Sequence, residues 1–186
     1  MVGPGGAGKT TAGAALADRL GVRFVDLDAE FAASSGDISA YLDTHGYDAY
    51  AERNVSLYSA LIGEPDRPEV VALSSGFMTY RDDIHPDYIG WRQRITSSDS
   101  TFVLLPSLDL ETCVAEIVRR QLLRPFTRTL EGEAQVIRTR FPTYVSLSAR
   151  KVETMRPIDA VATELLAVVA AQQAPFGRKN SGISSV

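Results

Sequence analysis

The chain has 186 residues and a net charge of −4, with 45% apolar and 23% charged residues, so collagen-like, low-complexity and wholly disordered proteins are excluded. Its length fits one compact domain. The apolar runs fall far short of the roughly 20 residues of a membrane span, the N-terminus lacks the pattern of a secretory signal, and the negative charge argues against nucleic-acid binding.

The first part of the chain predicts helices around one short strand. Good helix formers run over Ala12–Leu20, and Gly21 supplies a C-terminal stop. The β-type run that follows covers Val22–Asp28. We then expect three helices, over Ala29–Ser35, Ile38–His45 and Tyr47–Ile62.

The second part of the chain alternates strands with helices. The apolar runs Glu69–Leu73 and Thr101–Leu105 are typical of strands buried on both faces of a parallel sheet. A helix capped by Ser107 or Asp109 extends to about Gln121. We then expect a loop or lid over Arg124–Glu133 and a helix over Ala134–Arg150. A strand is expected over Val152–Met155 and a closing helix over Ile158–Ala171. This alternation predicts an α/β fold with a doubly wound parallel sheet.

We expect one domain over residues 1–172, with a lid around 119–135. The polar, aperiodic segment 173–186 is expected to be a disordered tail. The stretch from Arg119 to Arg156 carries eight arginines and one lysine against three glutamates, a local charge of +6. Either a solvated basic face or a site for phosphorylated ligands explains this excess.

The strongest motif stands at the start of the chain. Gly3-x-x-x-x-Gly8-Lys9-Thr10, followed by a helix, is a complete P-loop pattern. Its glycines let backbone N–H groups turn inward around phosphate oxygens, which then lie at the positive end of the helix. Lys9 would reach the β- and γ-phosphates, and Thr10 would bind Mg²⁺. We expect the nucleotide to contact Gly3, Gly5, Gly6, Ala7, Gly8, Lys9, Thr10 and Thr11.

A P-loop normally follows a buried strand, yet only Met1 and Val2 precede Gly3 here. Either the true start lies upstream, or the domain tolerates a truncated central strand. We favour the first alternative, because removing a buried strand leaves backbone groups of its neighbours unpaired. The expected fold is a P-loop NTPase-type parallel sheet sandwiched by helices, with its first strand truncated.

From Gly3 to about Leu166 the chain resembles the shikimate kinase family. The pair Asp26-Leu-Asp28 stands at the same distance from the P-loop lysine as that family's pair of aspartates. The resemblance implies that Asp26 holds Mg²⁺ through water. It also implies that Asp28 contacts and orients the substrate hydroxyl that attacks the γ-phosphate.

Arginine-containing segments extend the resemblance. Arg124-Pro125 is similar to the family's lid, whose arginine closes over the nucleotide phosphates. Arg140, in Arg140-Phe-Pro-Thr-Tyr144, stands where the family grips the substrate carboxylate. Arg119 or Arg120 would pack on adenine, and we assign this nucleotide contact to Arg120.

The chain departs from the family on the acceptor side, where the substrate that receives the phosphoryl group would bind. Ala51 stands where the family has a second carboxylate-binding arginine, and Ser74-Ser75-Gly76 replaces a triple glycine. Backbone N–H groups of Ser75 and Gly76 could still point at a substrate. Losing one arginine removes a charge-assisted contact of roughly 1.5 to 3 kcal/mol.

The sequence thus predicts a kinase that uses ATP and Mg²⁺ to phosphorylate a hydroxyl of shikimate, with Lys9, Asp28 and Arg124 as catalytic residues. The alternatives are a kinase of gluconate-kinase type, acting on a different hydroxy acid, and a regulatory pseudoenzyme that binds nucleotide without transfer. We expect a monomer with a small-molecule substrate and no nucleic-acid or membrane partner. With Cys113 as the only cysteine, no intrachain disulfide can form, and a cytoplasmic location is expected.

Overall fold

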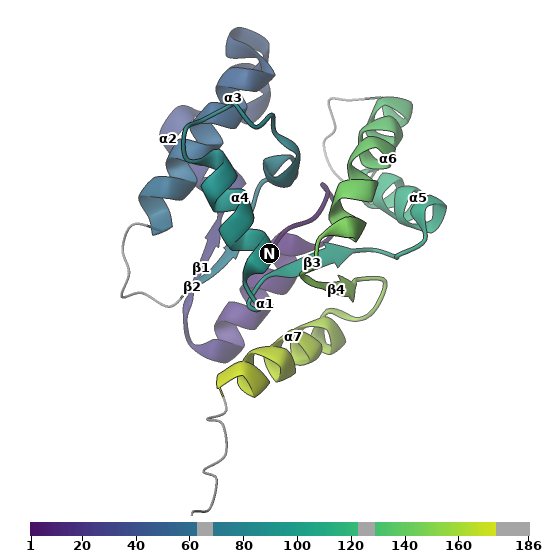
Figure 1. The fold of residues 1–186 in the computed structure, drawn as a ribbon. Helices are drawn as coiled ribbons and strands as arrows, with labels where there is room; N and C mark the ends of the chain where they lie inside the picture. The colour runs from purple at the N-terminus through teal and green to yellow at the C-terminus, as the bar shows by residue number, and fades with distance from the viewer. Residues whose placement is uncertain (63–68, 123–128, 174–186) are drawn as a thin grey trace, which may run out of the picture.

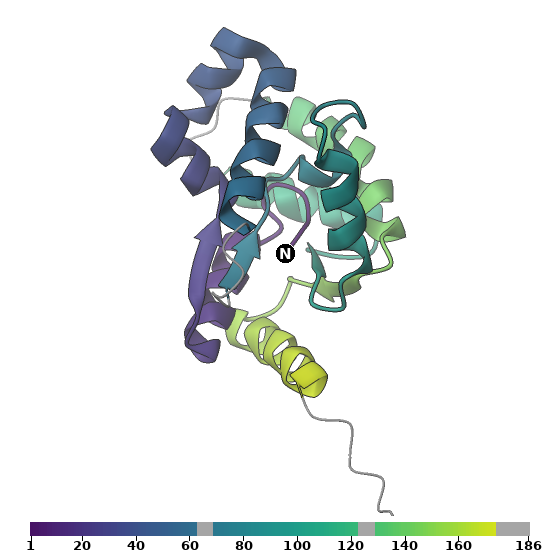
Figure 2. The ribbon, with the colours of Figure 1, turned by 60° about the vertical axis from the view of Figure 1, so that its left-hand side comes forward.

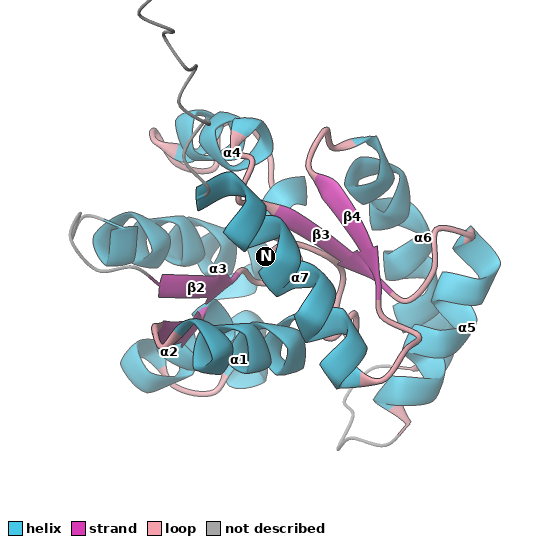
Figure 3. Cartoon of the chain, turned by 90° about the horizontal axis from the view of Figure 1, so that it is seen from below, coloured by secondary structure: helices cyan, strands magenta, loops and turns pink. Residues whose placement is uncertain are grey.

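Parallel strands lie at the centre of the molecule in a computed structural model that describes residues 1–62, 69–122 and 129–173 (Figure 1). Strand β1 (Arg23–Asp26) pairs with β2 (Glu69–Ala72), and β3 (Phe102–Leu105) pairs with β4 (Arg150–Glu153). Helices cover both faces, and Figure 3 shows β2 lying between α3 (Ile38–Ile62) and α1 (Lys9–Leu20). The predicted α/β class with a parallel sheet is confirmed.

Met1 and Val2 join the two strand pairs. The Met1 amine donates to the Val71 carbonyl at 2.6 Å, and Val2 N–H donates to the Phe102 carbonyl at 2.9 Å. Val2 also forms a parallel bridge with Val103. Met1 and Val2 therefore occupy the central strand position between β2 and β3. Burial in this position lowers the pKa of the Met1 amine to about 5.

The N-terminal helices follow the sequence prediction closely. Helix α1 ends at Gly21, whose φ of 65° is left-handed. Helix α2 (Leu27–Ser35) is followed by α3, which is helical except at Gly46, with φ of 80° and ψ of 172°. The two helices predicted on either side of Gly46 are thus the two segments of α3.

One boundary in this region was wrong. The strand predicted over Val22–Asp28 ends at Asp26, and Asp28 lies in the first turn of α2. The reason is a helix cap, because Asp26 Oδ1 accepts from the N–H groups of Asp28 at 3.0 Å and Ala29 at 3.4 Å. The cap starts the helix two residues earlier than the apolar pattern indicates.

After β2 come a 3₁₀ turn, η1 (Phe77–Thr79), and α4 (Tyr88–Ser97). The remaining helices are α5 (Leu110–Gln121), α6 (Leu130–Ser146) and α7 (Ile158–Gln173). The predicted cap of α5 is confirmed, since Asp109 Oδ1 accepts from Thr112 N–H at 2.9 Å. Figures 1 and 2 show α2 and α3 at the opposite end of the molecule from α7.

The helix predicted over Ala134–Arg150 was wrong at both ends. Helix α6 begins at Leu130, because the Thr129 hydroxyl caps it by accepting from Gly132 N–H at 3.1 Å. It ends at Ser146, and Arg150 opens β4. Within the predicted lid, residues 123–128 lie outside the described residues, and 130–133 are helical. The predicted tail beyond Gln173 also lies outside them.

Apolar side chains on both faces of the strands pack against the helices in two clusters. One cluster includes Leu27, Val55, Phe77, Ile117 and Tyr144, and another includes Leu16, Leu104, Val152 and Leu165. Cys113 is a buried free thiol in the first cluster, as its apolar neighbours predict. None of the described helices combines the length and apolarity needed to cross a membrane.

Candidate active site

The loop of residues 3–8 joins Val2 to α1 at the carboxyl end of the strands. Gly3 and Gly6 have φ of 147° and 72°, which L side chains rarely adopt. A Cβ on Gly3 would lie 2.3 Å from the Leu104 carbonyl oxygen, and one on Gly6 would lie 3.1 Å from Ile117 Cγ2. These glycines are required both by backbone conformation and by close packing against β3 and α5.

Lys9 lies in the first turn of α1, and its side chain reaches back over the loop. Its Nζ donates to the carbonyl of Gly3 at 2.8 Å and to that of Pro4 at 2.9 Å. The ammonium is thereby fixed beside the N-terminus of α1. A loop, a helix N-terminus and a lysine arranged in this way suit a chain of phosphate groups.

Thr10 and Asp26 bring two oxygen atoms together beside the loop. Thr10 Oγ1 donates to Asp26 Oδ2 at 2.6 Å, while Asp26 Oδ1 caps α2. Hard oxygen ligands of this kind suit Mg²⁺, which takes few protein ligands and keeps waters and phosphate oxygens. No group of three or more His, Cys, Asp or Glu side chains that could hold a metal ion gathers in the described part of the chain. The predicted metal pair fits magnesium.

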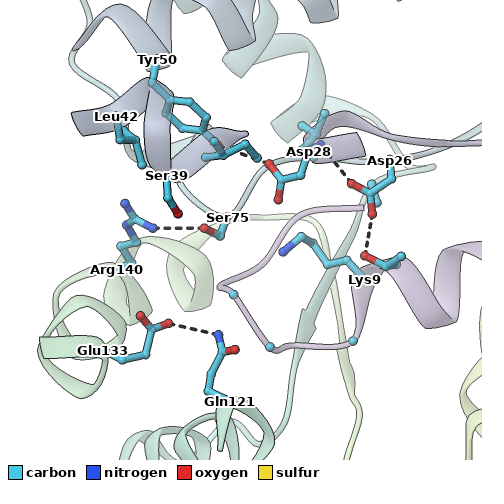
Figure 4. A pocket seen from close by; sticks show the side chains of 18 of the residues that line it. Lys9, Asp26, Asp28, Ser39, Leu42, Tyr50, Ser75, Gln121, Glu133 and Arg140 are labelled. Carbon is cyan, nitrogen blue, oxygen red and sulfur yellow. Dashed lines mark hydrogen bonds between the residues drawn. The ribbon is translucent and has the colours of Figure 1, made fainter. Parts of the chain in front are cut away.

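Asp28 lies beside this pair, in the first turn of α2. Its Oδ1 accepts from the Ser74 hydroxyl at 2.5 Å and from the Tyr50 hydroxyl at 3.3 Å. Burial, with a further contribution from the negative charge of Asp28, raises the pKa of Tyr50. Tyr50 therefore remains a phenol that donates to the carboxylate. In Figure 4 the side chains of Asp28 and Lys9 point into the same space.

Arg140, on α6, faces the acceptor side of this space. Its guanidinium donates to the Tyr47 hydroxyl at 2.9 Å and to Ser75 Oγ at 3.4 Å. The Tyr144 hydroxyl donates to the Ser75 carbonyl at 2.7 Å, and its burial raises the pKa of Tyr144. A Cβ on Gly76 would lie 2.4 Å from the Tyr47 oxygen, so glycine is needed for this approach. Helices α3 and α6 thus meet over the loop after β2.

Ala51 contributes no charge to this side of the site. It is buried in the core of the fold, as its methyl side chain allows. Arg53, two residues on, points elsewhere, and its Nε donates to Ser35 Oγ at 3.2 Å. Among the described residues that line the cavity, the cations are Lys9 and Arg140.

These groups line one cavity of about 300 Å³ (Figure 4). Of the residues named from the sequence, it brings together Gly5, Gly6, Gly8, Lys9, Thr10, Thr11, Asp26, Asp28, Ser75, Gly76 and Arg140. Gly3 and the buried Ala7 shape the loop from behind. Arg124 lies outside the described residues. The predicted phosphate-facing and acceptor-facing residues therefore share one space.

Arg120 lies on the other side of the loop. Its Nη1 donates to the Gly6 carbonyl at 3.0 Å and its Nη2 to the Thr154 carbonyl at 2.8 Å. The Arg120 Nε donates to Glu116 Oε1 at 2.7 Å. Arg120 lines an adjoining cavity of about 370 Å³ together with Thr11, Arg156 and Ile158. This position, beyond the phosphate loop, suits the base of a nucleotide.

Sequence reasoning missed several residues that line the main cavity. Tyr47 and Tyr50 come from the second segment of α3, and Gln121 and Glu133 come from α5 and α6. Glu133 is a buried carboxylate, and Gln121 Nε2 donates to it at 3.4 Å. The position of Tyr47 directly after the helix-breaking Gly46 was the one available signal.

Comparisons with known proteins agree with this geometry. A family model described as shikimate kinase matches residues 5–170. A shikimate kinase of Histophilus somni is 28% identical over 175 residues, covering 90% of this chain and 89% of that protein. One of Thermobifida fusca is 32% identical over 175 residues, covering 90% and 91%.

Solved structures show the same fold. The shikimate kinase of Acinetobacter baumannii in complex with shikimate has a TM-score of 0.71 and 22% identity, covering 93% of this chain and 92% of that one. The shikimate kinase of Bacteroides thetaiotaomicron has a TM-score of 0.69 and 19% identity, covering 91% and 96%.

Proposed function

The chain belongs to the shikimate kinase family, and from this premise we propose that it transfers the γ-phosphoryl group of ATP to a hydroxyl of shikimate. It is a phosphotransferase with an alcohol group as acceptor. The observation that carries the assignment is the single cavity lined by Lys9, Asp28 and Arg140. A phosphate-binding lysine, a carboxylate for a hydroxyl and a guanidinium for a carboxylate are the groups that phosphorylation of a hydroxy acid requires.

On the nucleotide side, backbone N–H groups of the loop would surround the phosphates and Lys9 would neutralise the β- and γ-phosphates. Arg120 would lie against adenine in the adjoining cavity. Thr10 and Asp26 would hold Mg²⁺, Asp26 through water, and the bound ion would offset charge on the β- and γ-phosphate oxygens. Arg124 is proposed to stabilise the transferring group from the lid.

On the acceptor side, Arg140 would hold the carboxylate of shikimate, and the backbone of Ser75 and Gly76 would line its ring. Asp28 would accept a hydrogen bond from the attacking hydroxyl and then its proton. The hydroxyl oxygen forms a bond to the γ-phosphorus while the bond to the β,γ-bridging oxygen breaks, and ADP leaves with that electron pair. Positioning and electrostatic stabilisation would supply most of the rate enhancement.

We further propose that the enzyme acts as a cytoplasmic monomer. Burial raises the pKa of the Cys113 thiol, which lowers its reactivity.

The test measures ADP release with MgATP and a panel of hydroxy acids, and identifies the phosphorylated product by ³¹P NMR. The proposal predicts ADP and shikimate phosphate in equal amounts. Transfer to gluconate or another hydroxy acid, without transfer to shikimate, would reject shikimate as the acceptor. ATP binding without transfer to any acid would favour the pseudoenzyme, and Asp28→Asn would then change nothing.

A further inference from the structure

Two buried polar side chains lie directly behind the Asp28 carboxylate. Ser74, in the loop after β2, is 2% exposed, and Asn54, on α3, is fully buried. Neither is among the described residues that line the cavity. Buried polar groups lower stability unless they are hydrogen-bonded, so the partners of these two side chains indicate what they do.

The two side chains form a short chain of contacts that ends on Asp28. Ser74 Oγ lies 2.5 Å from Asp28 Oδ1 and 2.7 Å from Asn54 Oδ1. Asn54 Nδ2 donates to the Tyr50 carbonyl, one turn earlier in α3, at 3.1 Å. That bond fixes the amide orientation and turns Oδ1 toward Ser74. Asn54 is therefore fixed by the helix, and the Ser74 hydroxyl lies between the Asn54 oxygen and Asp28 Oδ1.

The Ser74 hydroxyl has one proton for two neighbouring acceptors. The Asn54 oxygen and an ionised carboxylate are both acceptors, and the Ser74 hydroxyl carries a single proton. Bonds to a charged acceptor are shorter and stronger, which agrees with the 2.5 Å contact to Asp28. The hydroxyl proton therefore lies mainly in the bond to Asp28, and the Asn54 oxygen is the second, weaker acceptor of the same hydroxyl.

We propose that Ser74 is a positioning residue for catalysis, which holds Asp28 Oδ1 so that the other carboxylate oxygen meets the acceptor hydroxyl. This inference rests on the proposed function of Asp28. The cavity-facing oxygen would otherwise rotate with the side chain, since the remaining side-chain partner of Oδ1, Tyr50, lies at the longer distance of 3.3 Å. Ser74 thus adds a side-chain contact at a position where the family pattern has glycine.

The signature of this role is a change in kcat without a change in substrate binding. Ser74 lies behind the cavity wall, so removing its hydroxyl leaves the contacts of Lys9 and Arg140 intact. We expect Ser74→Ala to lower kcat about 10- to 100-fold, the effect of a reacting group displaced by up to 1 Å. The KM values for ATP and for the acceptor should stay within about 3-fold.

Ser59→Ala is the matched control. Ser59 lies on α3, its hydroxyl accepts from Trp91 Nε1 at 2.7 Å, and neither residue is among the described residues that line the cavity. We expect Ser59→Ala to lower thermal stability with kcat unchanged. If Ser74→Ala does not fold, Ser74→Cys replaces it, because the thiol has a similar size but is a weak donor. A kcat of Ser74→Cys equal to that of the wild type would overturn the proposal.

A double-mutant cycle tests whether Ser74 acts through Asp28. The residual activity of Asp28→Asn should fall no further when Ser74→Ala is added. An equal loss in both backgrounds would show that Ser74 acts independently of Asp28, and the proposal would be rejected.

A crystal structure of Ser74→Ala without substrate separates this inference from the proposed function. It should show Asp28 in a new or a second rotamer, and an unchanged single rotamer would overturn the inference whichever acceptor the enzyme uses. The absence of any acceptor-dependent ADP release by the wild type would instead reject the proposed function.

Discussion

The two sides of the cavity are built in different ways. The phosphate-facing part of the nucleotide side comes from consecutive residues, 3–11, and its shape is set by backbone conformation at Gly3 and Gly6. The acceptor side is assembled from α2, α3, the loop after β2 and α6, and its shape is set by side-chain hydrogen bonds. Figure 1 shows the phosphate loop between α3 on one side and α5 and α6 on the other.

This difference explains where variation is tolerated. A side chain added at Gly3 collides with the Leu104 carbonyl oxygen, and one at Gly6 crowds Ile117. On the acceptor side the shape depends on side-chain contacts, and there Ala51 and Ser74 stand where the family pattern has arginine and glycine. We expect the phosphate loop to respond to substitution through kcat, and Arg140 with its partner Tyr47 to respond mainly through the acceptor's KM.

The largest effect is expected on the nucleotide side. Lys9→Met removes the ammonium beside the phosphates and should lower kcat about 1,000-fold, because it removes charge stabilisation that grows in the transition state. The coupled ADP assay measures this loss. Lys151→Met is the control, since Lys151 donates to the Leu147 carbonyl and is not among the described cavity residues. A loss below 10-fold would contradict the role of Lys9.

On the acceptor side, Arg140→Ala should raise the KM for the acceptor about 10- to 100-fold by removing a charge-assisted contact to its carboxylate. The KM for ATP should stay within about 3-fold of the wild-type value. Arg138→Ala, on the same helix, is the matched control, because Arg138 pairs with Glu111 at 2.8 Å. Equal effects on both KM values would remove the distinction between the two sides.

A smaller effect is expected from the hydroxyl of Tyr47. Tyr47→Phe keeps the ring and removes the acceptor that orients the Arg140 guanidinium at 2.9 Å. The acceptor KM should rise about 3- to 10-fold, the equivalent of one neutral hydrogen bond or slightly more. Steady-state kinetics at fixed ATP measures this change. An unaltered acceptor KM would mean that Arg140 needs no partner from α3.

The smallest effect concerns stability on the nucleotide side. Hydrogen bonds from Arg119 and from Arg120 lower the pKa of Glu116 to about 2 from its ordinary value of 4.5. Ionised Glu116 therefore stabilises the fold above about pH 4.5, and this contribution is lost as the pH falls toward 2. Glu116→Gln should cost about 1 kcal/mol at pH 7 and flatten the acid side of the stability curve. A denaturation series between pH 2 and 7, measured at constant ionic strength, gives the slope of unfolding free energy against pH for the wild type and for Glu116→Gln. Equal slopes for the two proteins would contradict the assignment.

The same contrast separates what the sequence could predict from what it could not. The P-loop, the end of α1 at Gly21 and the break of α3 at Gly46 depend on local conformation and were confirmed. Asp28 was placed at the end of a strand, because the Asp26 cap that moves it into α2 is a side-chain contact.

The tertiary partners of the site were beyond the sequence pattern. The contacts of Ser74 with Asn54 and of Tyr47 with Arg140 join residues 20 and 93 positions apart. Neither spacing follows a helix or strand period, so nothing local predicted either pair. The arginines themselves were found through the family pattern, but the contact of Arg120 with the Gly6 carbonyl required the folded chain.

The most direct test is a crystal structure of the enzyme with MgADP and shikimate bound together. The account predicts ADP phosphates around residues 3–9, the shikimate carboxylate within hydrogen-bonding distance of Arg140, and one shikimate hydroxyl against the cavity-facing oxygen of Asp28. Shikimate bound away from both side chains, or nucleotide phosphates outside the loop, would contradict it.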